Sequence, residues 1–287
     1  MSKAVPHVTA FVLAGGGSLG AVEVGMLKEL LAWGERPAMV VGASAGAINA
    51  AFFAGDPTSA GAARLERLWC DLKRSDVFPF SLANLLGLLR QRDHLVDSHG
   101  LRRLLERHLP YLRLEDAGLP VHIVAADLLS GDEVVLSAGP VVDAVLASAA
   151  IPGVFPPVDI GGRLLVDGGV ANNTPVSTAI ALGATRVIVL PTGFACALQK
   201  APSGAVARAM HALGLLVARQ LVHDAERFAD VVQLRIVPSL CPLERSPYDY
   251  SASASLIEQA ASTTRHWLED GGLERGGVPM QLREHRH

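Results

Sequence analysis

The first 55 residues alternate between short apolar runs and glycine-rich turns. Val8–Ala14 is an apolar run of strand length, and apolar residues recur at helical spacing from Val22 to Leu31. A second apolar run, Ala38–Val41, leads into an alanine-rich helix that is expected to end near Ala54. Parallel strands need a crossover between them, usually a helix, so two such strand–helix units predict a parallel sheet.

The rest of the chain continues this alternation. Residues Thr58 to Leu109 are predicted to be helical with polar interruptions. Further strands are predicted at Val121–Ala126, Glu133–Leu136, Leu164–Val166, Val187–Leu190 and Val231–Ile236, and further helices at Val141–Ala149, Val176–Ala181, Ala205–Phe228 and Ser253–Leu268. The predicted fold class is therefore α/β, with a mainly parallel central sheet flanked by helices.

Composition supports a large buried core. Half of the 287 residues are hydrophobic and only 18% are charged, against about 25% in average soluble domains. Aromatic residues make up only 5%, so the apolar surplus consists of small and branched residues that suit close-packed parallel strands. Disorder is excluded, and the length suits one large α/β domain or two small ones. No linker argues for a second domain.

Charge and cysteine usage exclude other classes. Twenty-five basic and 28 acidic residues give a net charge of −3, so there is no basic footprint for nucleic acid. The uncharged runs Ala4–Val22 and Pro37–Gly55 are long enough to raise the question of a membrane span, but glycines interrupt both. The three cysteines, Cys70, Cys196 and Cys241, show no CxxC spacing, which disfavours a disulfide framework or a zinc site. We expect a cytoplasmic protein that needs no metal or cofactor.

A serine between two glycines follows the second predicted strand. Gly42-x-Ser44-x-Gly46 has the spacing of a nucleophile elbow, a tight turn that lifts a serine hydroxyl to the carboxyl edge of a sheet. The same pattern also fits a plain turn of small residues between a strand and a helix. The pentapeptide alone does not decide between these interpretations.

The first glycine loop has two possible functions. Gly15-x-Gly17-x-x-Gly20 fits the dinucleotide-binding fingerprint, which requires an acidic residue at the end of the second strand. That strand instead runs into Gly42 and Ser44 without an acid. Consecutive glycine amides beside a serine nucleophile can also form an oxyanion hole, and we favour this second function.

The serine would need a base. The histidines at 94, 99, 108, 211 and 223 fall in predicted helices, so we interpret them mostly as surface or partly buried helix residues. Asp167 ends an apolar strand and precedes Gly168 and Gly169, where it is either a base or part of an ordinary Asp-Gly turn. An exposed aspartate is a poor base near neutral pH, so burial or a hydrogen bond would have to tune it.

Taken together, the motifs resemble the patatin-like phospholipase family. The loop GGGSLG, the elbow GASAG, the block SAAIPGVFPPV at Ser148–Val158 and the triplet DGG occur in the family's order. The resemblance covers about residues 8–195 and is that of a bacterial-type single-domain member. It implies a three-layer α/β/α patatin-like fold, a catalytic core at 8–195, and a C-terminal extension at 196–287 packed on the same domain.

The resemblance also implies a Ser-Asp dyad that hydrolyses fatty-acyl esters of lipids through an acyl-enzyme. Ser44 corresponds to the nucleophile and Asp167 to the general base. The oxyanion loop corresponds to Gly15, Gly16 and Gly17; the remaining motif positions correspond to Gly20, Gly42, Gly46, Gly168, Gly169 and Pro152. The scheme needs no metal and no cofactor, and the expected partner is a lipid or other acyl ester.

One position departs from the family pattern. The family usually has Arg or Lys before the last glycine of the loop, where this chain has Leu19. Backbone donors survive this change, but a cation that could hold a phosphate is missing. An esterase acting on short soluble esters therefore stays open as an alternative, as does a catalytically silent lipid-binding regulator.

One apolar segment outside these motifs could contact a membrane. Val77–Leu89 contains two Phe and five Leu without a charge, followed by Arg90 and Arg92. It would serve as a lid or a peripheral membrane contact, or it would be a helix packed over the core, which we favour. Arg208 and Arg219 are expected to be solvated positions on the long amphipathic helix.

Overall fold

The computed structural model describes residues 7–78, 94–193, 205–241 and 249–276. The strands are β1 (Thr9–Leu13), β2 (Met39–Ala43), β3 (Val121–Asp127), β4 (Glu133–Leu136), β5 (Val158–Ile160), β6 (Arg163–Asp167), β7 (Arg186–Leu190) and β8 (Gln233–Ile236). The helices are α1 (Gly20–Trp33), α2 (Ala45–Gly55), α3 (Ser59–Asp71), α4 (Arg74–Val77), α6 (His99–His108), α7 (Val141–Ser148), α8 (Gly169–Asn172), α9 (Val176–Ala181), α10 (Ala205–Phe228) and α11 (Ser253–Glu269). Short 3-10 turns lie at Gly17–Leu19 and Leu114–Asp116.

The eight strands of the described residues belong to one sheet. Its order is β5-β6-β3-β2-β1-β7-β8, and β4 pairs with β3 outside this path. The five strands from β3 to β8 along this order are parallel, whereas β4 and β6 run antiparallel to β3, and β5 antiparallel to β6. The expectation of a mainly parallel α/β sheet is confirmed.

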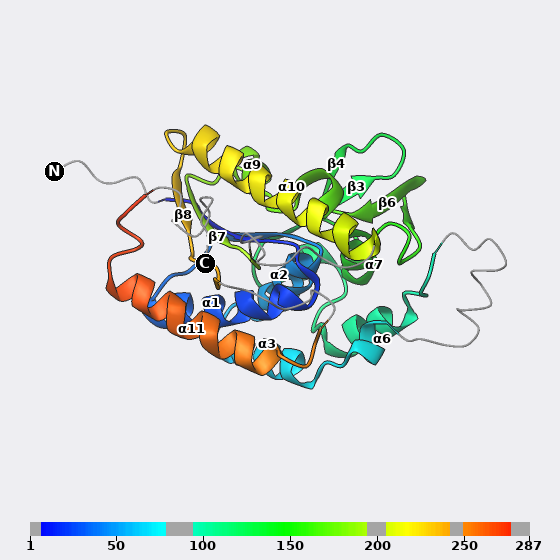
Figure 1. The fold of residues 1–287 in the computed structure, drawn as a ribbon, viewed down its shortest axis with the longest axis horizontal. Helices are drawn as coiled ribbons and strands as arrows, with labels where there is room; N and C mark the ends of the chain where they lie inside the picture. The colour runs from blue at the N-terminus through cyan, green and yellow to red at the C-terminus, as the bar shows by residue number, and fades with distance from the viewer. Residues whose placement is uncertain (1–6, 79–93, 194–204, 242–248, 277–287) are drawn as a thin grey trace.

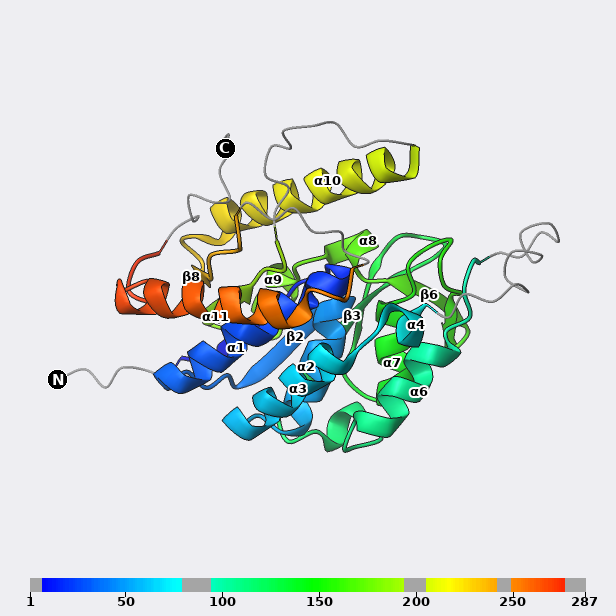
Figure 2. The same cartoon turned by 60° about the horizontal axis from the view of Figure 1, so that its bottom comes forward.

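The helices cover both faces of the sheet and give three layers. Alternate residues of a strand point to opposite faces, so Phe11 and Leu13 of β1 join one core cluster while Ala10 and Val12 join the other. The first cluster lies against α1, α2, α3 and α11, and the second against α9 and α10. Figures 1 and 2 show α10 and α11 on opposite sides of the sheet.

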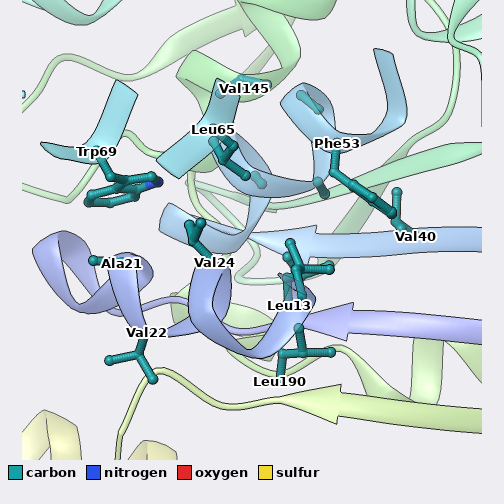
Figure 3. Close-up of a cluster of buried hydrophobic side chains, with 14 of the residues drawn as sticks. Leu13, Ala21, Val22, Val24, Val40, Phe53, Leu65, Trp69, Val145 and Leu190 are labelled. Atoms are coloured by element: carbon teal, nitrogen blue, oxygen red, sulfur yellow. The ribbon is translucent and has the colours of Figure 1, made fainter. Parts of the chain in front are cut away.

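The larger cluster accounts for most of the apolar surplus. Figure 3 shows Leu13 and Val40 from the sheet gathered with Val24 of α1 and Phe53 of α2. Both uncharged runs of the N-terminal region thus supply buried strands and the helices that cover them. No helix among the described residues is long and apolar enough to cross a bilayer.

The part of the last third that the structure describes adds β8, α10 and α11 to these layers. β8 extends the sheet by pairing with β7, where Val187 lies beside Leu234. α11 packs closely on α1: a side chain at Gly25 would collide with backbone atoms of Ile257 and Ala261. The division at residue 195 into a core and an extension stays a prediction.

Two short elements and one boundary differ from the sequence-based expectation. β5 and α8 were not expected, because runs of three and four residues carry too little periodicity to stand out. The strand expected from Val231 begins at Gln233, since the chain is still turning after α10 at that point. The other expected elements lie within about three residues of their predicted ends.

Candidate active site

The sheet topology brings two strand ends together from opposite directions. β2 runs parallel to β3 and places Ala43 beside Val124, while β6 runs antiparallel and places Asp167 beside Ala125. Because Val124 and Ala125 are successive residues of β3, the carboxyl ends of β2 and β6 meet at one point. Ser44 follows the first of these ends directly, so the serine and the aspartate are brought within contact of each other.

Ser44 sits in a strained turn between β2 and α2. Its φ of 52° and ψ of −118° make it the only non-glycine residue with positive φ in the described part of the chain. Such a conformation persists only where the surroundings enforce it. A side chain at Gly42 would run into the Gly46 carbonyl, and one at Gly46 would run into the Leu13 carbonyl. The turn is therefore tight enough to exclude any residue but glycine at both positions.

The Ser44 hydroxyl donates a hydrogen bond to Asp167. The distance from Ser44 Oγ to Asp167 Oδ2 is 2.6 Å, and the Gly169 N–H donates to the other carboxylate oxygen at 2.8 Å. Both side chains are buried, with 8% and 7% of their surface exposed. Burial raises the pKa of the Asp167 carboxyl from its ordinary 3.8 to about 6, although the bonds from Ser44 and Gly169 act to lower it.

A second serine, which the motif analysis did not single out, holds the elbow. The Ser148 hydroxyl accepts a hydrogen bond from the Ser44 N–H at 2.9 Å and donates one to the Val124 carbonyl at 2.5 Å. Ser148 ends α7 and is fully buried. The only sequence signal for it was its place at the start of the SAAIPGVFPPV block. The Ser44 N–H is thereby engaged and is not available to a substrate.

The glycine loop lies directly beside Ser44, and its first residue is fixed on both sides. A side chain at Gly15 would come within 3.1 Å of the Ser44 Cβ. The Gly15 N–H donates to the Asn173 carbonyl at 2.9 Å, and the Gly15 carbonyl accepts from Thr192 Oγ1 at 2.7 Å and from Asn173 Nδ2 at 3.2 Å. Asn173 and Thr192 were not identified from the sequence.

This arrangement changes which loop amides can act on a substrate. Gly15 was expected among the oxyanion donors, but its N–H already has an acceptor. Within the described ranges, the N–H groups of Gly16 and Gly17 have none. Gly17 has a φ of 59°, which a glycine adopts at little cost. Leu19, the residue in place of the family's usual cation, is half-buried and packs against the larger core cluster.

The remaining motif residues shape the turn after β6. A side chain at Gly168 would collide with the Val124 carbonyl, and one at Gly169 would crowd Asn173 and Asp167. Pro152 follows α7 in the loop that leads to β5. These glycines allow the backbone to pass close to β3 while Asp167 faces Ser44.

Other candidate groups lie elsewhere. In the described part of the chain, no histidine is hydrogen-bonded to Ser44; His94 contacts Asp97, and His99, His108 and His223 are exposed on helices. Groups of acidic, histidine and cysteine side chains that could hold a metal ion are also absent from these ranges. Arg208 and Arg219 are exposed on α10, as expected.

The Val77–Leu89 segment is described only at its start. Val77 and Phe78 are buried, and Phe78 stacks on Phe155 with ring centroids 5.3 Å apart. Residues 79–89 lie outside the described residues. Contact between this segment and a membrane stays a prediction.

Comparison with known proteins identifies the family. The model of the family described as patatin-like phospholipase matches residues 11–180, more than half of the chain. The chain belongs to the patatin-like phospholipase family. The matched range includes the glycine loop, Ser44 and Asp167, so the resemblance seen in the motifs is confirmed.

Relatives of this patatin-like protein are longer than the chain itself. An NTE family protein of Mycobacterium tuberculosis, named as uncharacterised, is 36% identical over 175 residues, which cover 59% of this chain and 28% of the relative. Human patatin-like phospholipase domain-containing protein 6 is 30% identical over 189 residues, covering 65% of this chain and 13% of the relative. The similarity therefore concerns the patatin-like region and only a minor part of those proteins.

Two solved structures resemble the fold at low sequence identity. VipD from Legionella pneumophila matches with a TM-score of 0.47 and 14% identity, covering 91% of this chain and 68% of VipD. ExoU, solved in complex with SpcU from Pseudomonas aeruginosa, matches with a TM-score of 0.45 and 20% identity, covering 95% and 53% of the two chains.

The buried carboxyl of Asp167 predicts a pH-dependent stability difference. Its pKa is about 6 in the folded protein and near 3.8 when unfolded, so the wild type loses stability as pH rises from about 4 to 6. Asp167→Asn removes this loss. We expect the variant to be more stable than the wild type at pH 8, by up to about 3 kcal/mol, and the gain to disappear near pH 4, as measured by chemical denaturation.

Asp127→Asn provides the opposite control for this experiment. The hydrogen bond from Arg163 holds the pKa of Asp127 below its ordinary value, so its charge stabilises the folded protein at pH 8. This variant should be less stable than the wild type at pH 8. A loss of stability in Asp167→Asn at pH 8 would contradict the assigned pKa direction.

Proposed function

We propose that this protein hydrolyses fatty-acyl ester bonds of lipids, with Ser44 as nucleophile and Asp167 as general base. The observation that carries the proposal is the 2.6 Å hydrogen bond from the Ser44 hydroxyl to a buried carboxyl whose pKa is raised to about 6. A base in this range accepts a proton near neutral pH far better than an exposed aspartate does. Membership of the patatin-like phospholipase family supports a lipid hydrolase.

The proposed reaction has two steps. Asp167 Oδ2 takes the Ser44 proton as Oγ attacks the ester carbonyl carbon, and the protonated carboxyl then gives that proton to the leaving alkoxide. In the second step Asp167 removes a proton from water, the hydroxide attacks the acyl-enzyme, and the fatty acid leaves as Ser44 regains its proton. No other acid or base is needed.

The oxyanion formed in each step needs donors fixed in advance. The N–H groups of Gly16 and Gly17 are suited to this role because they lie in the loop beside Ser44 and have no acceptor in the described part of the protein. We propose that these two amides hold the oxyanion, and that Gly15 anchors the loop through Asn173 and Thr192. Preorganised donors of this kind typically contribute two to three orders of magnitude to kcat each.

Replacing either member of the dyad should abolish turnover. We expect Ser44→Ala and Asp167→Asn to lower kcat for a p-nitrophenyl acyl ester by at least about a thousandfold, because each removes a group that takes part in both steps. The circular dichroism spectra should match the wild type. Exposed residues of the same types, Ser255→Ala and Asp132→Asn, serve as controls that should keep full activity.

Full activity in Ser44→Ala would refute the nucleophile assignment. A fluorophosphonate probe gives independent evidence, since it should label the wild type and fail to label this variant. If the probe does not label the intact wild type, the catalytically silent lipid-binding alternative would be supported instead.

The pH dependence should follow the Asp167 carboxyl. The base must be ionised to accept the serine proton, so kcat/KM for a soluble ester should rise with pH and level off above a midpoint of about 6. Steady-state assays between pH 4 and 8 measure this midpoint. A midpoint near 4, the ordinary value for an aspartate, would show that burial does not tune the base.

Leu19 bears on the choice between lipids and short soluble esters. The half-buried leucine offers no charge to a phosphate, but its contact with the apolar core is compatible with an acyl chain nearby. We expect kcat/KM to rise with acyl chain length from C2 to C12 and phospholipid vesicles to be hydrolysed. A maximum at C2 to C4 with no release of fatty acid from vesicles would favour the soluble-ester alternative.

A further inference from the structure

A carboxyl with no surface exposure lies next to the glycine loop. Glu23, in the first turn of α1, is 0% exposed, and its Oε1 accepts a hydrogen bond from the Ala14 N–H at 2.6 Å. Its Oε2 accepts one from Asn49 Nδ2, on α2, at 2.7 Å. Nothing in the two-step reaction above uses either side chain.

Asn49 joins the carboxyl to the far end of the loop. Its Nδ2 group also donates to the Gly20 carbonyl at 2.8 Å, while its Oδ1 accepts from Trp69 Nε1 at 2.7 Å. The indole thereby fixes which side of the Asn49 amide faces Glu23. Trp69 comes from α3, lies over the start of α1 (Figure 3), and stacks on Tyr250.

These contacts enclose the loop from both ends. Ala14 is the last residue before the three glycines, and Gly20 is the first residue of α1 after them. Glu23 and Asn49 are hydrogen-bonded to each other and each holds one end, so a network of side chains links the two ends of residues 15–19. The Ala14 N–H also donates to the Leu190 carbonyl of β7 at 3.3 Å. Gly16 and Gly17, the proposed oxyanion donors, lie between the two ends.

Burial of the Glu23 carboxyl is unfavourable for folding, because the group loses its contacts with water. Desolvation raises the pKa of Glu23 well above its ordinary value, even though Asn49 and the Ala14 amide act in the opposite direction. A well-packed apolar group at a buried position is often no less stabilising than a buried ionisable one. The carboxyl is therefore better explained by what it holds in place than by its contribution to stability.

We propose that Glu23 and Asn49 are positioning residues that fix the glycine loop so that the Gly16 and Gly17 amides face the oxyanion. This inference rests on the proposed function, since it assigns the support of the same site. The two residues touch neither the substrate nor the Ser44–Asp167 pair, and they act only through the loop backbone. Their effect should therefore fall on kcat and on covalent labelling of Ser44.

A glutamine cannot replace Glu23 despite its nearly identical shape. Its carbonyl oxygen could accept from the Ala14 N–H, but its NH2 group would then face the NH2 group of Asn49. Asn49 cannot turn over to relieve this, because its reversed amide would set donor against donor at Trp69 and acceptor against acceptor at Gly20. The substitution thus breaks the network while leaving packing volume almost unchanged.

The test measures kcat and KM for a p-nitrophenyl ester, the rate of fluorophosphonate labelling, and Tm. We expect Glu23→Gln to lower kcat and the labelling rate by about tenfold to a hundredfold, somewhat less than loss of a whole oxyanion donor, with KM changed less than threefold. Assays are run well below the Tm of each variant. Glu29→Gln, on the same helix and paired with the exposed Arg265 of α11, should leave kcat unchanged.

A second substitution should restore part of the loss. In Glu23→Gln/Asn49→Asp, the new carboxyl in its protonated form can accept from both the glutamine NH2 group and Trp69 and can donate its proton to the Gly20 carbonyl, so the ring of hydrogen bonds closes again. We expect the double variant to recover at least about threefold in kcat over Glu23→Gln. Such rescue would not occur if Glu23 served only to fill space.

Several outcomes would overturn the inference. If Glu23→Gln folds and keeps the kcat of the wild type, the network has a structural role only. The same conclusion follows if the fraction of active protein falls while kcat per labelled Ser44 stays unchanged. If Glu23→Gln does not fold, Trp69→Phe decides, because it keeps an aromatic side chain but removes the N–H donor that orients Asn49. An unchanged kcat in that variant would refute the proposal. Activity in Ser44→Ala would instead refute the proposed function on which the inference rests, whatever the Glu23 variants show.

Discussion

The hydrogen bond between Ser44 and Asp167 depends on two strands that reach β3 from opposite directions. Helix crossovers keep β2 parallel to β3, whereas β6 runs antiparallel after the loop that follows α7. One strand end carries the serine and the other the aspartate, and the two ends lie beside successive residues of β3. A sheet with only parallel strands would place both side chains on the same edge but would not direct their strand ends towards each other.

The close approach of the two strand ends explains why glycines are frequent around the site. Backbone carbonyls occupy the space where side chains at Gly42, Gly46 and Gly168 would stand. The same crowding holds Ser44 in a backbone conformation that non-glycine residues rarely adopt. The glycine-rich motifs are thus a packing requirement of the site, and the strain at Ser44 is maintained by the rigid layers on either side of the sheet.

Two buried carboxyls lie close to the site, and they differ in what they can do. Asp167 faces the Ser44 hydroxyl, and its raised pKa suits it to exchange protons. Glu23 is enclosed by Ala14, Asn49 and the core, where it accepts a hydrogen bond from each of these residues and holds the loop. Both oppose folding through desolvation, so the stability of the protein rests on the two apolar clusters that flank the sheet.

The sequence by itself determined the α/β class, nearly all of the long elements, and the two motif residues Ser44 and Asp167 that the fold brings together. These features are local: hydrophobic period identifies a helix or strand, and glycines around a polar residue mark a tight turn. The antiparallel course of β6 left no such mark, because strand direction depends on how a connection packs and not on its residues alone.

Tertiary structure alone decided which polar groups face one another. Small polar residues hold the elbow and the glycine loop, but they lie far along the chain from these elements and carry no motif: Ser148, Asn173 and Thr192. Glu23 likewise has no feature in the sequence that sets it apart from other helix residues. Their roles arise because burial leaves each donor and acceptor with few possible partners. Burial also set the pKa of Asp167, since the desolvation of a carboxyl depends on the atoms packed around it and not on its neighbours in sequence.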